Sequence, residues 1–327
     1  MVKIDVYAEL ASRMKYPKSE RLRAIFKKMV TSEEAKILLE LPTPPEDIAK
    51  KLNLDWKTVH KRVGELFQAG LAVPTSKGYF LPRTIGQFHD TCLTDPGLTT
   101  ELADLWQEFC EEEWFSDHAE ELARAEPKVM KVIPMWKAIQ TSRHILPSED
   151  VRQIIQQAEL VAMAPCPCRK RGRQCDAPID TCLQLNKAAE YVIRRGTGRE
   201  VFKEEAIDIL GNAEDRGLMH TAPPFSVVCS CCSCCCNILR PLIKYGKLSQ
   251  GLLKTSYRAV VNQEFCDGCQ LCIDQCRFEA IDMKKYPAFK RDKAFVDVEK
   301  CFGCGTCVVK CPVEGALRLE LANSLAV

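Results

Sequence analysis

Apolar and polar positions in the first quarter of the chain alternate with the period of an α-helix in three successive segments. Thr31 and Glu34 form a capping-box pattern ahead of the first segment. Thr43 is placed to cap the second, with Pro44 at its first helical position, and Asp55 to cap the third. The apolar positions are Ala35, Ile37, Leu38, Leu39 and Leu41, then Ile48, Ala49 and Leu52, then Val59, Val63, Leu66 and Phe67. We therefore expect three short amphipathic helices.

A hairpin pattern follows the third helix. Gly70 can end that helix, and residues 71–73 and 78–81 then predict two short strands. Helix, helix, helix and hairpin is the element order of a winged helix-turn-helix. Residues 20–85 resemble the MarR/ArsR-type DNA-binding modules of bacteria and archaea. The resemblance implies a winged helix-turn-helix fold for this part of the chain.

The same resemblance implies that the third helix is a recognition helix. It would present Lys57, His60 and Lys61 outward, with Arg62 at its flank. Glu65 lies close by, and the net charge of the whole chain is only +2, whereas a surface that tracks phosphates is usually more basic. Two roles stay open, specific DNA binding and docking or dimerisation, and we expect the docking role.

The next part of the chain predicts helices and no recognisable chemistry. Leu102, Leu105, Trp106, Phe109 and Cys110 form one stripe at helical spacing. Further on, helices are expected from Cys182 to about residue 195 and from about residue 200 to Asp215, with Gly217 as the stop. The middle of the chain is therefore expected to be mostly helical.

A length of 327 residues suggests several domains. We predict an α+β multidomain chain with a winged-helix domain at 1–90, a helical linker domain at 91–160, a cysteine-rich iron–sulfur domain at 161–258 and a ferredoxin-like two-cluster domain at 259–327. No secretory signal opens the chain, and no apolar run approaches a membrane span. Twenty cysteines without a secretory signal favour metal binding over disulfides, in a reducing cytoplasm and an anaerobic host.

Two four-cysteine runs occupy the last quarter of the chain. Each has the spacing C-x2-C-x2-C-x3-C, which is that of bacterial ferredoxins with two [4Fe-4S] clusters, and Pro312 closes the second run. The fourth cysteine of each run is expected to bind the other cluster. One predicted ligand set is Cys266, Cys269, Cys272 and Cys311, and the other is Cys301, Cys304, Cys307 and Cys276. Gly268, Gly303 and Gly305 suit loops that wrap a cluster.

Residues 259–321 resemble a bacterial-type ferredoxin domain, which implies low-potential electron transfer through two cubane clusters. Arg277 departs from the family pattern, which usually has proline after the fourth cysteine of this run. The departure loosens the turn but removes no ligand. Zinc sites seldom repeat a four-cysteine run of this kind, so a zinc or disulfide interpretation is disfavoured.

The middle of the chain carries ten more cysteines in two runs. The first is Cys166, Cys168, Cys175 and Cys182, set among cationic side chains that favour thiolates, and it could supply a complete third cluster. The second is Cys229, Cys231, Cys232, Cys234, Cys235 and Cys236, which residues 225–228 could deliver on a strand end. Three interpretations of the second run stay open: a fourth cluster or ligands shared with the first run, a zinc or other soft-metal site, and a redox-active vicinal dithiol. His220 is the one candidate non-cysteine ligand or proton donor.

These motifs favour electron transfer through several [4Fe-4S] clusters, two in the ferredoxin part and one or two in the middle. No dinucleotide fingerprint or P-loop is visible, so no two-electron site of the chain's own is predicted. We expect an electron-transfer subunit that serves a partner oxidoreductase, a flavoprotein or a metalloenzyme. The alternatives are an iron–sulfur redox sensor that binds DNA, which would need a dimer, and an oxidoreductase with its active site at residues 229–236.

Overall fold

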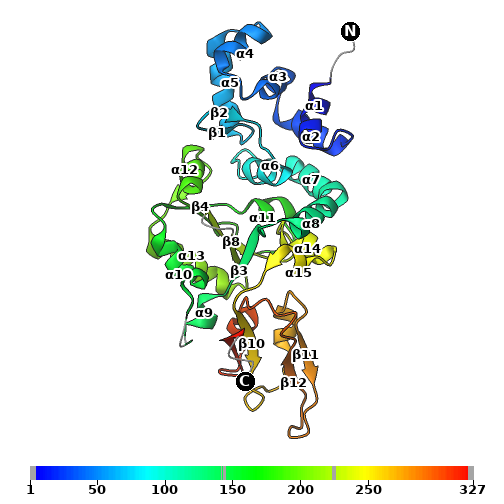
Figure 1. The fold of residues 1–327 in the computed structure, drawn as a ribbon, viewed down its shortest axis with the longest axis vertical. Coiled ribbons are helices and arrows are strands. Elements are labelled where there is room, and N and C mark those ends of the chain that lie inside the picture. The colour runs from blue at the N-terminus through cyan, green and yellow to red at the C-terminus, as the bar shows by residue number, and fades with distance from the viewer. Residues whose placement is uncertain (1–4, 141, 143–144, 223–225, 323–327) are drawn as a thin grey trace. The chain divides into compact units, whose positions relative to one another are not determined.

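A computed structural model describes residues 5–140, 142, 145–222 and 226–322. The chain forms two compact units (Figure 1). Unit 1 comprises Met1–Asp117, Pro165–Arg173 and Arg194–Thr197, and unit 2 comprises His118–Ala164, Gln174–Ile193 and Gly198–Val327. Helices and strands occur in both, as the predicted α+β class requires. The predicted division into four domains stays a prediction.

Unit 1 begins with the predicted order of three helices and a hairpin, preceded by two further helices. The elements are α1 Val6–Arg13, α2 Glu20–Met29, α3 Ser32–Glu40, α4 Pro45–Leu52, α5 Trp56–Gln68, β1 Val73–Thr75 and β2 Gly78–Phe80. Helices α3, α4 and α5 pack against one another, and β1 pairs antiparallel with β2. The buried side chains of α5 are the four that its apolar pattern predicts.

The helix caps follow the sequence with one correction. Thr31 and Glu34 form the capping box, with the Glu34 N–H donating to Thr31 Oγ1 at 3.3 Å and the Thr31 N–H to Glu34 Oε2 at 2.8 Å. Asp55 Oδ2 accepts from the Thr58 N–H at 2.8 Å. The cap predicted at Thr43 is wrong, because Pro44 is extended, with ψ 147°, and takes the capping position without a side-chain bond.

The rest of unit 1 is helical around an aromatic core. Its elements are α6 Ile85–Cys92, α7 Thr100–Phe109, the π-helical turn η1 Cys110–Trp114, the start of α8 Phe115–Arg124, and α11 Pro167–Gly172. The ring of Phe88 lies 4.9 Å from that of Phe26 and 5.0 Å from that of Trp106, and all three side chains are fully buried. Arg171 of α11 stacks over the ring of Phe115 at 4.9 Å.

Unit 2 is built on a seven-stranded sheet that the sequence did not predict. Its order is β6-β4-β5-β8-β7-β3-β9, antiparallel except for β3 beside β9. The strands are β3 Met130–Ile133, β4 Val161–Ala164, β5 Cys182–Leu185, β6 Arg199–Glu200, β7 Met219–Ala222, β8 Val227–Cys231 and β9 Leu252–Leu253. The helical elements predicted for the middle of the chain therefore omitted the sheet, while helices still occupy more of the middle of the chain than strands do.

The clearest single error is the helix predicted from Cys182. Cys182–Leu185 is strand β5, Asn186 has a left-handed φ of 54°, and the helix α12 begins only at Lys187. The helix expected to end near Asp215 is confirmed as α13 Lys203–Asp215, with Gly217 at φ 71° beyond its end. The remaining helices before the ferredoxin motif are α9 Trp136–Ile139, η2 Pro147–Glu149, α10 Val151–Gln157, α14 Leu239–Lys244 and α15 Leu248–Gly251.

The last quarter of the chain adds two strand pairs and two short helices, coloured from orange to red beyond β10 in Figure 1. The elements are β10 Tyr257–Val261, α16 Leu271–Gln275, β11 Ile281–Lys284, β12 Lys293–Val296, α17 Thr306–Val309 and β13 Leu317–Leu321. β10 pairs with β13 and β11 with β12, both antiparallel. A single hydrophobic core joins these elements to Met135, Met219 and Leu239.

None of the helices in the described part of the chain is both long and apolar enough to cross a membrane.

Candidate metal centres

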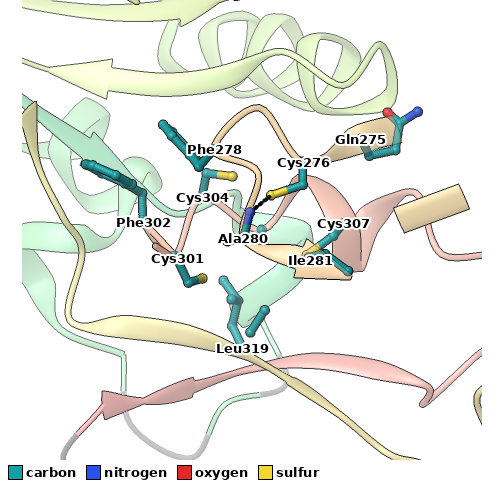
Figure 2. A pocket seen from close by; sticks show the side chains of 13 residues that line it. Gln275, Cys276, Phe278, Ala280, Ile281, Cys301, Phe302, Cys304, Cys307 and Leu319 are labelled. Carbon is teal, nitrogen blue, oxygen red and sulfur yellow. Dashed lines mark hydrogen bonds between the residues drawn. The ribbon is translucent and has the colours of Figure 1, made fainter. Parts of the chain in front are cut away.

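The first cavity of the ferredoxin part is surrounded by four cysteines from both motifs. Cys276 follows α16, Cys301 and Cys304 lie in the loop before α17, and Cys307 belongs to α17. Figure 2 shows their thiols around one hollow, with the stacked rings of Phe278 and Phe302 to one side. The hollow has a volume of about 330 Å³, and its other side chains are apolar except for Gln275.

The second cavity has the complementary set. Cys266, Cys269, Cys272 and Cys311 line a hollow of about 340 Å³, together with Met283, Ala294 and Leu317. Three of these cysteines come from the first motif and the fourth from the second. Helices α16 and α17 pack against each other, which brings the end of each motif to the other motif's loop. The structure thus groups the eight cysteines in the two sets that the spacing predicts, and the ligand roles themselves stay a prediction.

Two glycines allow the loops to close around the first cavity. Gly303 has φ 72°, and a Cβ there would lie 2.2 Å from the Tyr257 carbonyl oxygen. Gly305 has φ 87°, and a Cβ would lie 2.6 Å from the Cβ of Ala138. Side chains cannot be accommodated at such separations, and positive φ is costly for residues other than glycine. The loops therefore have the close backbone approach that a cluster site needs.

Burial disfavours free thiolates in both cavities. It raises the pKa of Cys307 well above its usual value, and it also raises the pKa of Cys304 and Cys311. Burial and the neighbouring Cys266 raise the pKa of Cys272 to about 11. A thiol binds iron as a thiolate and releases its proton to solvent, so a cationic centre in the cavity favours the deprotonated form of these side chains. Four convergent thiols and a mostly apolar lining fit a [4Fe-4S] cluster in each cavity.

Arg277, the departure from the ferredoxin pattern, connects the two cysteine-rich regions. Its Nη1 donates to Ser233 Oγ at 3.1 Å and its Nη2 to the Gly217 carbonyl at 3.2 Å. Ser233 lies between Cys232 and Cys234, and Arg277 directly follows Cys276. The guanidinium therefore ties the loop of the middle run to the first cavity.

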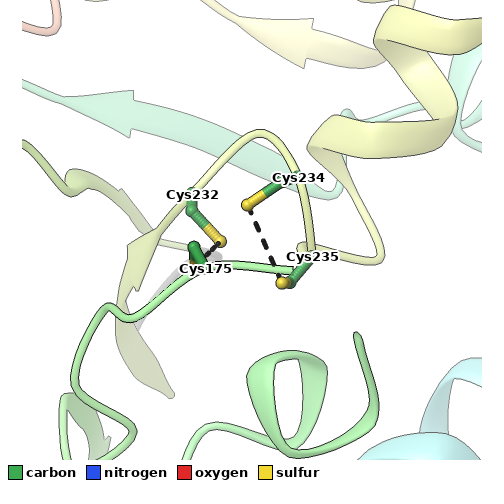
Figure 3. Close-up of side chains that lie close together, drawn as sticks. All are labelled: Cys175, Cys232, Cys234 and Cys235. Atoms are coloured by element: carbon green, nitrogen blue, oxygen red, sulfur yellow. Dashed lines mark hydrogen bonds between the residues drawn. The ribbon is translucent and has the colours of Figure 1, made fainter. Parts of the chain in front are cut away.

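Four cysteines of the middle of the chain form a tight group. Cys175 lies in the loop after α11, and Cys232, Cys234 and Cys235 lie in the turn after β8 (Figure 3). Their four sulfur atoms all lie within 4.8 Å of one another. The Sγ–Sγ distances are 3.8 Å for Cys175–Cys232 and 3.8 Å for Cys234–Cys235. We call this set the four-thiol group.

The remaining cysteines of the middle runs within unit 2 form a chain of sulfur contacts. Cys182 of β5 and Cys229 of β8 lie 3.8 Å apart, and Cys231 and Cys236 lie 3.6 Å apart. The hydrogen bonds with Cys182 and Cys231, together with burial, raise the pKa of Cys229 well above its usual value. Cys175 and Cys182 of the first run thus each contact the second run, so the interpretation of shared ligands describes this geometry. Phe225, which was expected to start the delivering strand, lies outside the described residues.

The other two cysteines of the first run belong to unit 1. Cys166 occupies the capping position of α11, and Cys168 lies in that helix. Ligand atoms of Cys168, His89 and Asp90 lie within 4.8 Å of one another. The neighbouring cations make other contacts as well: Lys170 donates to the Asp95 carbonyl at 2.9 Å.

The buried side chain of His220 has a hydrogen-bond partner at each ring nitrogen. Its Nε2 lies 3.2 Å from Glu214 Oε1 and its Nδ1 lies 3.2 Å from Ser230 Oγ, and the ring is fully buried. Glu214 in turn accepts from the Trp136 and Lys137 N–H groups at 2.6 and 3.1 Å. Both ring nitrogens are engaged, which fits a structural histidine and leaves neither nitrogen for a metal.

The outward face of α5 is less basic than its sequence suggests. Lys57, His60 and Lys61 are exposed as predicted. Lys61 Nζ, however, lies 3.6 Å from Glu65, and Arg62 pairs with Glu34 at 3.3 Å and with Glu65 at 2.9 Å. Two of the helix's cations are therefore already neutralised, which weakens the attraction for phosphates.

Comparison with known proteins bears on the last quarter of the chain. Residues 265–315 match the family model described as a 4Fe-4S dicluster domain. A 52-residue stretch is 38% identical to the ABC transporter E family member 1 of Arabidopsis thaliana, and it covers 16% of this chain and 9% of that protein. No solved structure matches the chain significantly. Residues 265–315 therefore form a ferredoxin-like 4Fe-4S domain.

Proposed function

We propose that this chain is an electron-transfer protein that passes single low-potential electrons to or from a partner oxidoreductase. The observation that carries the proposal is the pair of cavities, each lined by four cysteines drawn from both ferredoxin motifs. Cys276, Cys301, Cys304 and Cys307 would hold one [4Fe-4S] cluster, and Cys266, Cys269, Cys272 and Cys311 the other. Such clusters supply one-electron chemistry. The chain's own residues would shield the clusters from solvent and provide the surface through which electrons reach the partner.

Electrons would pass to the partner protein from the cluster in the second cavity. Of the eight ferredoxin cysteines, all of which the structure describes, Cys269 is the exposed one. Two large apolar side chains flank the same motif at the surface, Phe265 at 56% and Leu271 at 48% exposure. Exposed apolar side chains beside a redox centre are typical of a docking face for a protein partner. The partner would contact this rim.

The middle region would hold one further cluster. Outside the four-thiol group, four cysteines of the two middle runs remain within unit 2, which is the number that a cubane cluster takes. These four are Cys182, Cys229, Cys231 and Cys236. A third cluster would extend the path of the electron beyond the ferredoxin domain.

The N-terminal helices and hairpin would dock a protein and would not read a DNA sequence. The support is the neutralisation of Lys61 and Arg62 by Glu65 and Glu34. Selection of genomic fragments at about 0.15 M salt, with the protein oxidised and then reduced, tests this role. We expect no enriched site. Enrichment of one palindromic site that is lost in the Lys57→Glu/Lys61→Glu variant would support the redox-sensor alternative.

Electron exchange with a surrogate flavoprotein reductase tests the docking face. Leu271→Glu should slow reduction by the flavoprotein at least several-fold while leaving reduction by a small viologen dye unchanged, because only the protein donor needs the apolar rim. Phe202→Glu is the matched control, since Phe202 is also an exposed large apolar side chain but lies beside α13, outside the ferredoxin domain. Equal rates for both variants with the flavoprotein would refute the proposed docking face.

A further inference from the structure

The spacing of the sulfur atoms in the four-thiol group is that of a single metal ion. A tetrahedral zinc ion binds thiolates at about 2.3 Å, which separates its sulfur ligands by about 3.8 Å. Cys175 and Cys232 are 3.8 Å apart at sulfur, as are Cys234 and Cys235, and all four sulfurs lie within 4.8 Å of one another. Four sulfurs at these separations suit one tetrahedral ion.

The ferredoxin cysteines provide an internal reference for a larger cofactor. They surround hollows of about 330 and 340 Å³. Within the described ranges of the chain, no three of those eight sulfurs form a group as tight as the four-thiol group. The same fold therefore holds its cysteines apart where clusters are expected and brings them together at residues 175 and 232–235.

Two vicinal pairs of the second run, Cys231–Cys232 and Cys235–Cys236, are each divided between two sites. Cys232 contacts Cys175, whereas its neighbour Cys231 contacts Cys236 at 3.6 Å. Cys235 likewise belongs to the four-thiol group while its neighbour Cys236 does not. Neither of these two pairs is therefore placed as a redox dithiol, and the adjacent Cys234 and Cys235 both belong to the four-thiol group.

Backbone amides also point at these sulfurs. Hydrogen bonds run from the backbone of Gln174 to Cys235 and from the backbone of Cys235 to Cys232. Such N–H to sulfur bonds orient and stabilise metal-bound thiolates. The two segments that carry the ligands have no regular secondary structure and are 57 residues apart in the chain, so an ion would cross-link them.

We propose that Cys175, Cys232, Cys234 and Cys235 bind one zinc ion, in addition to the iron–sulfur clusters of the proposed function. All four positions of the ion are filled by protein, which is the closed coordination of a structural zinc site. Ser233, between two ligands, receives the hydrogen bond of Arg277. The zinc loop thereby positions the residue that holds Arg277 beside Cys276.

Metal analysis of the full chain, expressed and purified without oxygen, tests the proposal. The wild-type protein should contain about one zinc per chain, and Cys175→Ser should lose it while keeping its iron. Cys269→Ser is the crossed control and should lose iron while keeping zinc. Loss of iron without zinc in Cys175→Ser would overturn the proposal and assign these cysteines to a cluster.

Zinc-edge X-ray absorption of the wild-type protein makes the test independent of the folding of any variant. Four sulfur neighbours at about 2.3 Å are expected. A zinc-free protein, zinc with nitrogen or oxygen neighbours, or a single iron atom in this site would each overturn the proposal. The proposed electron-transfer function has a separate test: a full chain that lacks the roughly eight iron atoms of the ferredoxin domain would contradict that function without bearing on the zinc site.

Discussion

The two cysteine-rich regions of unit 2 differ in how close together they place their cysteine sulfurs. In the ferredoxin domain, loops with glycines at positive φ and a mostly apolar lining hold four thiols around each hollow of about 330–340 Å³. In the four-thiol group, a turn after β8 and a loop after α11 bring four sulfurs within 4.8 Å of one another. The comparison teaches that the spacing of sulfur atoms, more than the number of cysteines, indicates whether a site suits a multinuclear cluster or a single ion.

The largest effect is expected from removing a ligand of the first cavity. Cys307→Ala should remove or convert one cluster, with the loss of up to about four iron atoms per chain, because Cys307 is buried and is one of the four proposed ligands of that cluster. Iron and acid-labile sulfide assays measure the loss, and zinc should be unaffected. Cys92→Ala, in unit 1 and outside all the cysteine runs, should keep its full iron. Equal iron in both variants would contradict the ligand assignment.

A backbone change at the same cavity should have the next largest effect. Gly303→Ala places a methyl group 2.2 Å from the Tyr257 carbonyl oxygen in a left-handed conformation, which should lower the free energy of unfolding by more than about 2 kcal/mol and reduce iron loading. Chemical denaturation under anaerobic conditions measures it. Gly211→Ala, within α13 and with no atom within 4 Å of the added methyl, should stabilise by about 0.5–1 kcal/mol. Destabilisation in both would show that the cavity loop is not specially constrained.

Removing Arg277, which connects the loop of the middle cysteines to the ferredoxin domain, should give the smallest effect. Arg277→Ala removes hydrogen bonds to Ser233 Oγ and to the Gly217 carbonyl, so we expect a loss of about 1–3 kcal/mol without loss of zinc or iron. Arg291→Ala, at an exposed position between β11 and β12, should change stability by less than about 0.5 kcal/mol. Ser233→Ala should reproduce part of the Arg277→Ala effect. Additive effects of Arg277→Ala and Ser233→Ala in the double variant would rule out the direct bond.

The two cysteine sets of the ferredoxin domain were largely predictable from the sequence, because they depend on residues close together in the chain. A run of C-x2-C-x2-C-x3-C places three thiols on one tight loop and sends the fourth past a short helix, so the spacing alone predicts the two sets that line the cavities. The caps of Thr31 and Asp55 were predictable for the same reason, because each is completed within three residues.

The sheet and the four-thiol group were not predictable, because they depend on distant pairings. Strands of two to five residues, such as β5, are too short to distinguish an alternating pattern from a helical one. Cys175 contacts Cys232 across 57 residues of chain, and six cysteines within eight residues do not reveal which side each one faces. The bond between Arg277 and Ser233 joins residues 44 positions apart, and no local signal indicates it.

Electron paramagnetic resonance of the dithionite-reduced wild-type protein tests most directly whether the ferredoxin domain holds two [4Fe-4S] clusters. Two [4Fe-4S] clusters in adjacent cavities should give the split, spin-coupled spectrum of a pair, and their midpoint potentials should be low, as all-cysteine ferredoxin clusters have. In Cys307→Ala the coupling should disappear and leave the signal of one cluster. A reduced spectrum without coupling in the fully iron-loaded wild-type protein, or the same coupled spectrum in Cys307→Ala, would contradict the account.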